Sequence, residues 1–220
     1  MKKILTLIIL TLILTGCSSK RDVISANLNS SEQPKYQVNE SLVSITNFGG
    51  SNYNYSSKID LDNNIFKTEF VFEMNNHETS MLKYSFLDNN AIKNFISTSN
   101  EGEWFETNET VRTNYFLEQD HIRRVSKSDD YYIVSVYSDV LELYLKEYEA
   151  NIPFDFEYLN SLGSYDIKMF IEDDLVKMIE VDLLDLVNTD DENIIEYESV
   201  LLKINYNYDD IEIIIPEGIN

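Results

Sequence analysis

The alternation of apolar and polar residues restricts the fold of this chain more than any other feature of its sequence. Between residues 66 and 74, apolar side chains or threonine stand at every second position, and lysine or glutamate fills most of the places between them. A period of two puts alternate side chains on opposite faces of an extended chain, so this segment predicts a half-buried β-strand. The same pattern predicts strands at residues 165–171, 175–183, 200–208 and 211–215, with further candidates at 53–59, 81–86, 103–107, 111–117 and 131–137.

Clusters of aspartate and asparagine separate these runs. Examples lie at residues 62–64, 75–76, 88–90, 173–174, 190–191 and 209–210. Asx side chains bond to their own backbone and tolerate left-handed conformations, so they mark turns. Strand and short polar turn, repeated about ten times, predict an antiparallel meander.

Two short helices fit between the strands. Asp139 can cap the first, Glu142 stands three residues later as in a capping box, and apolar residues follow at helical spacing to Tyr148. Glu142 and Lys146 are spaced to pair on its surface. The second candidate, over residues 91–99, has Ile92, Phe95 and Ile96 on one side. The fold class is therefore mostly β (α+β): a curved antiparallel sheet or half-barrel with one or two short covering helices.

Such a sheet has an apolar face with little helix to cover it. It must close on itself, dimerise or hold something apolar. We expect five large apolar residues to line a ligand site: Phe66, Phe70, Phe72, Met74 and Trp104. The alternative for each of them is ordinary packing, because aromatic residues favour strands.

The first seventeen residues read as an export signal. Lys2 and Lys3 precede an eleven-residue apolar run, Ile4 to Leu14, which is too short to span a bilayer and suits a secretory signal. Leu14-Thr15-Gly16-Cys17 resembles the lipobox of bacterial lipoproteins, and Cys17 is the single cysteine of the chain. The resemblance implies that the Cys17 thiol is alkylated by a diacylglyceryl group and becomes the N-terminus after cleavage. The alternative is a plain signal peptide with an incidental cysteine.

These observations divide the chain into three parts. Residues 1–16 are the lipoprotein signal peptide, residues 17–40 are the lipidated N-terminus and a flexible polar tether, and residues 41–220 form a single antiparallel β domain. A first strand or helix within residues 36–43 is the alternative for the end of the tether. The bias toward Ile and Asn and against Ala suggests a low-GC Gram-positive host. The expected location is then the outer face of the cytoplasmic membrane, with the membrane contacted through the lipid anchor.

The net charge of −22 argues against nucleic acid as a partner, because a nucleic-acid binder needs a basic surface. The charge is uneven, since residues 129–220 contain 24 acidic residues and four basic ones. This acidity favours a domain that stands clear of an anionic bilayer.

Catalytic and metal-binding motifs fail at their defining positions. His77 and Glu78 begin like a zincin helix, but Met81 stands where the second histidine is needed. Asp60, Asp62 and Asn64 match the start of an EF-hand loop, whose glycine and final glutamate are missing, so a solvated turn is favoured there. No phosphate-binding glycine motif occurs. We expect no catalytic residues, no metal and no cofactor, and a protein that is not an enzyme.

Two further motifs resemble a known family. Gly102-Glu103-Trp104-Phe105 is similar to a turn and strand in the lipoprotein-localisation factors and lipid-carrying lipoproteins (the LolA/LolB and LppX/LprG type). The segment from Ile204 to Pro216 resembles the final hairpin of that superfamily. The resemblance covers about residues 41–218. It implies a curved antiparallel half-barrel partly plugged by helices, with an apolar cavity for acyl chains and no catalytic residues.

The sequence thus predicts an extracytoplasmic lipoprotein that binds an acyl chain or other amphiphile on an apolar concave sheet face. The alternative is an acidic protein-interaction or structural module of the cell envelope, without a small-molecule ligand. An enzyme of unrecognised type is the third hypothesis, and it would require His77 or His121 to meet a serine or carboxylate in a cleft.

Overall fold

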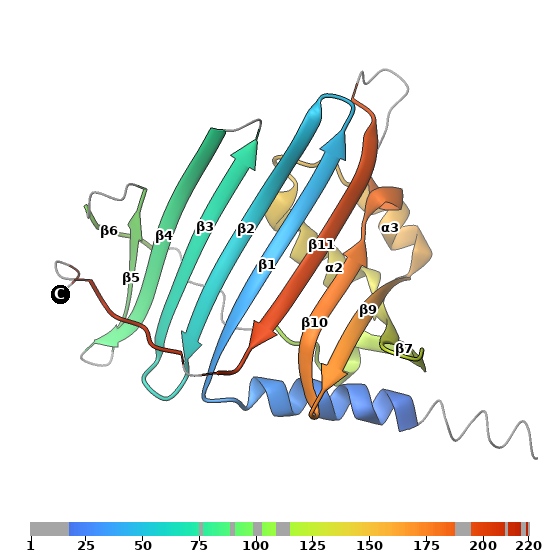
Figure 1. Cartoon of the computed structure of the whole chain (residues 1–220), viewed down its shortest axis with the longest axis horizontal. Helices are drawn as coiled ribbons and strands as arrows, with labels where there is room; N and C mark the ends of the chain where they lie inside the picture. The colour runs from blue at the N-terminus through green and yellow to red at the C-terminus, as the bar shows by residue number, and fades with distance from the viewer. Residues whose placement is uncertain are drawn as a thin grey trace, which may run out of the picture. The chain divides into compact units, whose positions relative to one another are not determined.

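The computed structural model describes residues 18–74, 77–88, 91–98, 103–108, 115–187, 195–209, 211–216 and 219. Its strands pair antiparallel, and only a few short helices accompany them, which confirms the predicted mostly-β class (Figure 1). In the part of the chain that is described, no helix has the length and apolar character needed to cross a membrane.

Two compact units make up the chain, where the sequence predicted a single domain over residues 41–220. Unit 1 comprises Met1–Glu32, Phe116–Val181 and Asp185–Asn188, and unit 2 comprises Gln33–Tyr115, Asp182–Leu184 and Thr189–Asn220. The division follows from the chain's path: the N-terminal segment packs with the central part of the sequence, and the final strand pairs with the first.

Unit 2 is an antiparallel meander with the strand order β6-β5-β4-β3-β2-β1-β11. Its strands are β1 (Lys35–Thr46), β2 (Gly49–Asp60), β3 (Ile65–Met74), β4 (His77–Asp88), β5 (Ala91–Ser97), β6 (Phe105–Glu106) and β11 (Tyr197–Asn207). The register places Phe66 opposite Ile59, and Ile59 opposite Tyr36, so these three apolar side chains share one side of the sheet. We call this side the first face and the opposite side, which carries Lys67 and Glu69, the second face.

The first face is fully buried over β1 and β11, where Val38 is 1% exposed and Leu42 is 0% exposed. Its polar atoms are hydrogen bonded. The Ser57 hydroxyl is 2.9 Å from that of Thr68 and 2.7 Å from that of Tyr115, and the Tyr206 hydroxyl donates to the Tyr115 carbonyl at 2.7 Å. Satisfied polar groups of this kind remove the penalty of burying a hydroxyl among apolar side chains.

Unit 1 contains a second run of strands in the order β10-β9-β8-β7. They are β7 (Ile122–Lys127), β8 (Tyr132–Tyr137), β9 (Ser164–Glu172) and β10 (Leu175–Asp182). The helices are α2 (Ser138–Leu145) and α3 (Phe156–Leu162), with single 3-10 turns at η1 (Gln119–His121), η2 (Lys146–Tyr148) and η3 (Leu184–Leu186, of which Leu184 belongs to unit 2). A further helix spans residues 18–31, drawn in blue in Figure 1.

The helix over residues 18–31 corrects the predicted tether. Its buried side chains recur at helical spacing, at Val23, Ala26, Asn27 and Ser30. Asn27 and Ser30 bind into the unit: the Asn27 side-chain oxygen accepts from the Leu117 N–H at 3.0 Å, and the Ser30 hydroxyl accepts from the Val176 N–H at 2.9 Å. The flexible tether over residues 17–40 is therefore wrong from Ser18 onward, because polar residues here anchor the helix and β1 already begins at Lys35. The alternative of a strand within residues 36–43 is confirmed.

The predicted helix at residues 139–148 is confirmed as α2 followed by η2, with the Glu142–Lys146 ion pair at 2.8 Å. Its N-cap is Tyr137 rather than Asp139, and the Asp139 carboxylate instead accepts from the Val140 N–H at 3.0 Å. The helix α3 has Asp155 as its cap and ends at Gly163, whose φ of 68° is a left-handed conformation that suits glycine.

Four other sequence predictions fail, in whole or in part, or lie partly outside the described residues. Residues 91–99 are not a helix, since β5 occupies Ala91–Ser97. Residues 211–215 are irregular rather than a strand, and the strand at 103–107 is reduced to Phe105–Glu106. Of the candidate at 111–117, residues 111–114 lie outside the described residues and 115–117 are irregular.

Candidate functional site

Cys17, the predicted lipidation site, lies outside the described residues. The helix over residues 18–31 begins at the next residue, Ser18. Adjacent Cα atoms are only about 3.8 Å apart across a trans peptide. A lipid on Cys17 is therefore bonded almost directly to a helix that is docked on unit 1.

Four of the five predicted ligand-lining residues stand together on the first face of β3. Phe66, Phe70 and Phe72 are half-buried, and Met74 is 47% exposed. Two of the rings stack on tyrosines of β2, with 4.6 Å between the centroids of Phe72 and Tyr53 and between those of Phe70 and Tyr55. Stacking fixes these rings in place but leaves part of each exposed.

The exposed apolar surface continues across the neighbouring strands. The register carries the first face from Phe70 to Met81 of β4, and from Leu87 of β4 to Ile92 of β5. Leu87 is 46% exposed and Ile92 is 66% exposed. We call this surface the apolar strip; its residues are Phe66, Phe70, Phe72, Met74, Met81, Leu87, Ile92 and Ile96.

Trp104, the fifth predicted residue, lies on the other side of the sheet. Its ring meets Tyr84 edge-on, with centroids 5.2 Å apart, and Tyr84 is opposite Lys67 on the second face. There it joins a cluster of Tyr84, Phe86 and Ile219, against which Ile65, Phe95, Ile213 and Ile215 also pack. Trp104 is thus a partly buried residue that packs against a separate cluster, away from the other four predicted residues.

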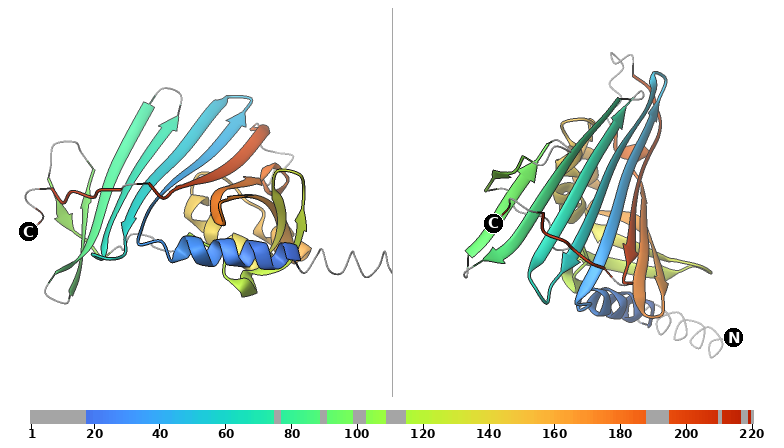
Figure 2. Two further views of the ribbon diagram at one scale, coloured as in Figure 1. Left: turned by 60° about the horizontal axis from the view of Figure 1, so that its bottom comes forward. Right: turned by 60° about the vertical axis from the view of Figure 1, so that its left-hand side comes forward.

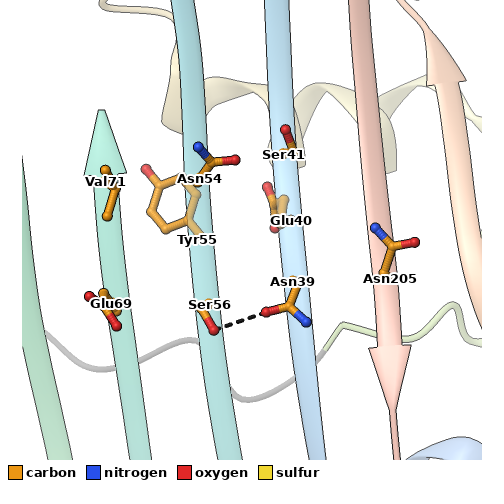
Figure 3. A pocket seen from close by; sticks show the side chains of 9 residues that line it. All are labelled: Asn39, Glu40, Ser41, Asn54, Tyr55, Ser56, Glu69, Val71 and Asn205. Carbon is orange, nitrogen blue, oxygen red and sulfur yellow. Dashed lines mark hydrogen bonds between the residues drawn. The ribbon is translucent and has the colours of Figure 1, made fainter. Parts of the chain in front are cut away.

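A shallow polar hollow of about 220 Å³ lies on the second face over β1, β2, β3 and β11 (Figure 3). It is lined by Asn39, Glu40, Ser41, Asn54, Tyr55, Ser56, Glu69, Val71 and Asn205. The Asn39 side-chain oxygen accepts from Ser56 at 2.9 Å and from Gln37 at 2.9 Å. Sequence reasoning missed this hollow, since alternating Asn and Ser also describe an ordinary solvated sheet face.

The two histidines do not meet in a cleft. His77 is exposed at the start of β4. His121 is half-buried, and its Nδ1 accepts a hydrogen bond of 3.1 Å from the Glu118 backbone N–H. Glu118 and Asp120 bring carboxylates within 4.8 Å of His121, an arrangement that exposed acidic groups often adopt without a metal.

The residues that begin like an EF-hand form a turn. Both carboxylate oxygens of Asp60 accept hydrogen bonds from Asn63, at 3.1 Å from its backbone N–H and 2.9 Å from its side chain. Lys35 completes the arrangement with its ammonium 2.9 Å from the same carboxylate. Burial of the Asp60 carboxyl disfavours its charge, but the bonds from Asn63 and Lys35 outweigh this and hold its pKa below the usual value.

Comparison with known proteins identifies the N-terminal segment. A family model for the prokaryotic membrane lipoprotein lipid attachment site matches residues 1–18. This chain is a membrane lipoprotein with a lipid attachment site. The match confirms the lipobox resemblance, and lipidation of Cys17 stays a prediction. No curated protein matches the chain.

Two crystal structures are similar to the chain as a whole. One is a domain from Vibrio parahaemolyticus assigned as an outer membrane lipoprotein-sorting protein, at 8% identity and a TM-score of 0.32, covering 86% of this chain and 90% of that one. The other is a DUF1329 family protein from Desulfovibrio piger, at 10% identity and a TM-score of 0.32, covering 88% and 91%. Similarity at this level bears on neither the site nor the ligand of this lipoprotein.

Proposed function

We propose that this lipoprotein binds an acyl chain or a similar amphiphile on the apolar strip of unit 2, and that it does so without catalysis. The strip carries the proposal. Leu87 of β4 is 46% exposed and Ile92 of β5 is 66% exposed, and Met81 and Ile96 are half-buried, while the same face over β1 is fully buried. Contiguous apolar surface on a water-soluble face marks a binding site more often than scattered exposed residues do.

The chemistry of the strip suits a hydrocarbon chain. Two stacked aromatic pairs, Tyr53 with Phe72 and Tyr55 with Phe70, form a fixed floor, and the flexible thioethers of Met74 and Met81 can adjust to it. Lys83 lies opposite Thr68 on the same face and offers a cation for the head of an anionic amphiphile. Each methylene transferred from water to such a surface contributes about 0.8 kcal/mol.

We further propose that the protein works on the outer face of the cytoplasmic membrane. The lipid attachment site supports membrane anchoring, and the residue bias of the sequence supports a host without an outer membrane. A non-enzymatic role is supported by the histidines, one exposed on β4 and one bonded to the Glu118 backbone.

Photo-crosslinking tests the binding proposal. The lipidated protein in phosphatidylcholine vesicles is illuminated with a diazirine-labelled fatty acid, and the labelled peptides are mapped by mass spectrometry. We expect labels on the strip residues of β3 to β5 and none in residues 103–108 and 211–216, which lie around Trp104 on the second face. Ile92→Asp, at a 66% exposed position, should reduce the labelling at least tenfold.

Leu143→Asp is the matched control, because Leu143 is 72% exposed on α2 and lies outside the strip. It should leave the labelling unchanged. Uniform labelling over the surface, or equal loss in both variants, would contradict acyl binding and favour the acidic interaction module.

A further inference from the structure

We infer that unit 1 lies directly on an anionic bilayer through a basic edge next to the lipid anchor. The basic edge consists of Lys20, Arg21, Arg123, Arg124 and Lys127, from the first turns of the helix over residues 18–31 and from β7. This inference does not depend on acyl binding by unit 2. It replaces the expectation that the acidic domain stands clear of the membrane.

The two parts of the edge are joined by a hydrogen bond. The Lys20 ammonium donates to the Ile122 carbonyl at 2.7 Å, so the first turn of the helix is fixed at the start of β7. Arg21 follows Lys20 in the helix and Arg123 follows Ile122 in β7, so each arginine is adjacent in sequence to one partner of this hydrogen bond. Figures 1 and 2 both show β7 beside the N-terminal end of this helix.

A β-bulge turns both arginines of β7 outward. Ile122 pairs with Val136 and Arg124 with Ser135, so Arg123 is the additional residue of the bulge. Burial along β7 consequently recurs every third residue, with Ile122 and Val125 inside and Arg123 and Arg124 exposed. A regular strand would have placed one of the two arginines on the buried side.

The concentration of positive charge here is unusual for this chain. The described part of unit 1 contains eight basic and eighteen acidic residues, and five of the eight basic residues belong to the basic edge. The Arg124 side chain is 73% exposed, with the Asp166 carboxylate 3.8 Å away. Arg123 donates to the Ser164 hydroxyl at 3.1 Å.

Five carboxylates stand close in sequence to the edge, at Asp22, Glu118, Asp120, Asp129 and Asp130, and the Asp166 carboxylate lies 3.8 Å from Arg124. They offset much of the positive charge of the edge, so its attraction to anionic lipid is weak by itself. The anchor makes a weak attraction sufficient, because a lipid on Cys17 holds Ser18 at the surface and gives the edge a high effective concentration there. Each basic residue near an anionic surface then changes the association by about fivefold.

Hydrogen exchange of the lipidated full-length protein tests the inference. The protein is reconstituted in vesicles of phosphatidylcholine alone and in vesicles with about one third phosphatidylglycerol. We expect added protection of residues 18–31 and 122–127 in the anionic vesicles only. The protection should vanish in 1 M salt, where the screening length falls to about 3 Å.

Two triple variants with the same net charge separate the edge from a general charge effect. Arg21→Ser, Arg123→Ser and Arg124→Ser together should abolish the added protection. Lys146→Ser, Lys168→Ser and Lys177→Ser remove the other three basic residues in the described part of unit 1 and should retain the added protection. Circular dichroism in phosphatidylcholine vesicles verifies that both variants are folded.

Equal protection in the two vesicle types would overturn the inference. Added protection that persists in the triple arginine variant would overturn it as well. Equal loss in both variants would also overturn it, because net charge alone would then explain the effect. In any of these cases the arginines would serve only to prevent edge pairing of β7 with other chains.

Discussion

The side-chain oxygen of Asn27 accepts a hydrogen bond of 3.0 Å from the backbone N–H of Leu117, ninety residues away in the sequence. The Asn27 amide nitrogen donates in turn to the Val23 carbonyl at 2.9 Å and lies 3.5 Å from the Met169 sulfur. Since the residue is 2% exposed, it binds the helix that follows the lipid anchor to the body of unit 1. The membrane anchor is thereby coupled to the stability of a folded unit.

Asn27→Ala should therefore destabilise unit 1 by about 1–3 kcal/mol, because it leaves the buried Leu117 N–H without its acceptor. Urea denaturation followed by circular dichroism measures this change. Asn29→Ala is the control. Asn29 is exposed on the same helix and donates at 3.3 Å to the Asp174 carbonyl, so its loss should change stability by less than about 0.5 kcal/mol. Equal effects of the two substitutions would contradict an anchoring role for Asn27.

The same helix shows what sequence patterns can and cannot predict. Large apolar residues mark the alternation in β3 and the helical spacing in α2, so both elements were predictable from the sequence. The buried side of the helix over residues 18–31 is made of Ser19, Val23, Ala26, Asn27 and Ser30. Three of these five are polar, and each can be buried only because the folded unit satisfies its hydrogen bonds. Hydrophobic periodicity cannot detect a helix that is held in this way.

Residues 91–99 and 211–215 failed for a different reason. Ile92, Phe95 and Ile96 have helical spacing, yet in β5 Phe95 packs with Phe86 on the second face while Ile92 belongs to the first. Because both faces of this strand have apolar contacts, its sequence lacks the alternation of apolar and polar residues that marks a half-buried strand. At residues 211–215 the alternation is real, since Ile213 and Ile215 pack inward and Ile214 is 72% exposed, but no strand is formed there.

Lowering the pH should selectively weaken the turn between β2 and β3. The Asp60 side chain is 6% exposed and its pKa is below the usual value, so its ionised form stabilises the fold. This contribution is complete above the unfolded-state pKa of about 4 and is lost as the pH falls through the lower folded-state pKa. Asp60→Asn should cost about 1–3 kcal/mol at pH 7 and progressively less below pH 4.

Urea unfolding of the wild type and of Asp60→Asn at pH 7 and at pH 3 measures how far their free energies of unfolding converge. Asp62→Asn removes the same charge at an exposed position of the same turn and should have little effect at either pH. A pH-independent difference between the wild type and Asp60→Asn would show that the carboxylate charge is not the stabilising element.

Alkaline titration should reveal tyrosines that resist ionisation. Burial, and secondarily the nearby Tyr208, raises the pKa of Tyr36 to about 12, and burial raises that of Tyr206 well above its ordinary value. The unfolded chain releases these protons near pH 10, so stability is constant below that pH and falls as the pH rises above it. Absorbance of phenolate should show a late, cooperative phase that accompanies unfolding.

Tyr206→Phe should reduce the amplitude of this late phase. It also removes the 2.7 Å bond to the Tyr115 carbonyl and should destabilise the protein by about 1–3 kcal/mol at neutral pH. Tyr137→Phe, at a position 41% exposed, is the control and should change the stability at neutral pH by less than about 0.5 kcal/mol. A late phase that survives Tyr206→Phe in full would contradict the assignment of Tyr206.

Ile213, Ile215 and Ile219 should stabilise unit 2, because they pack in the cluster that contains Tyr84, Phe86 and Trp104. Ile219 is 1% exposed and packs with Tyr84 and Phe86, whereas Ile214 is 72% exposed. Ile219→Ala should cost about 2–5 kcal/mol through lost burial and the cavity left behind. Ile214→Ala should cost less than about 0.5 kcal/mol.

Trp104, the single tryptophan of the chain, reports on the packing of this cluster. Its emission should shift to longer wavelength in Ile219→Ala and remain unchanged in Ile214→Ala. A red shift of the same size in both variants would contradict the packing of Ile219 in this cluster.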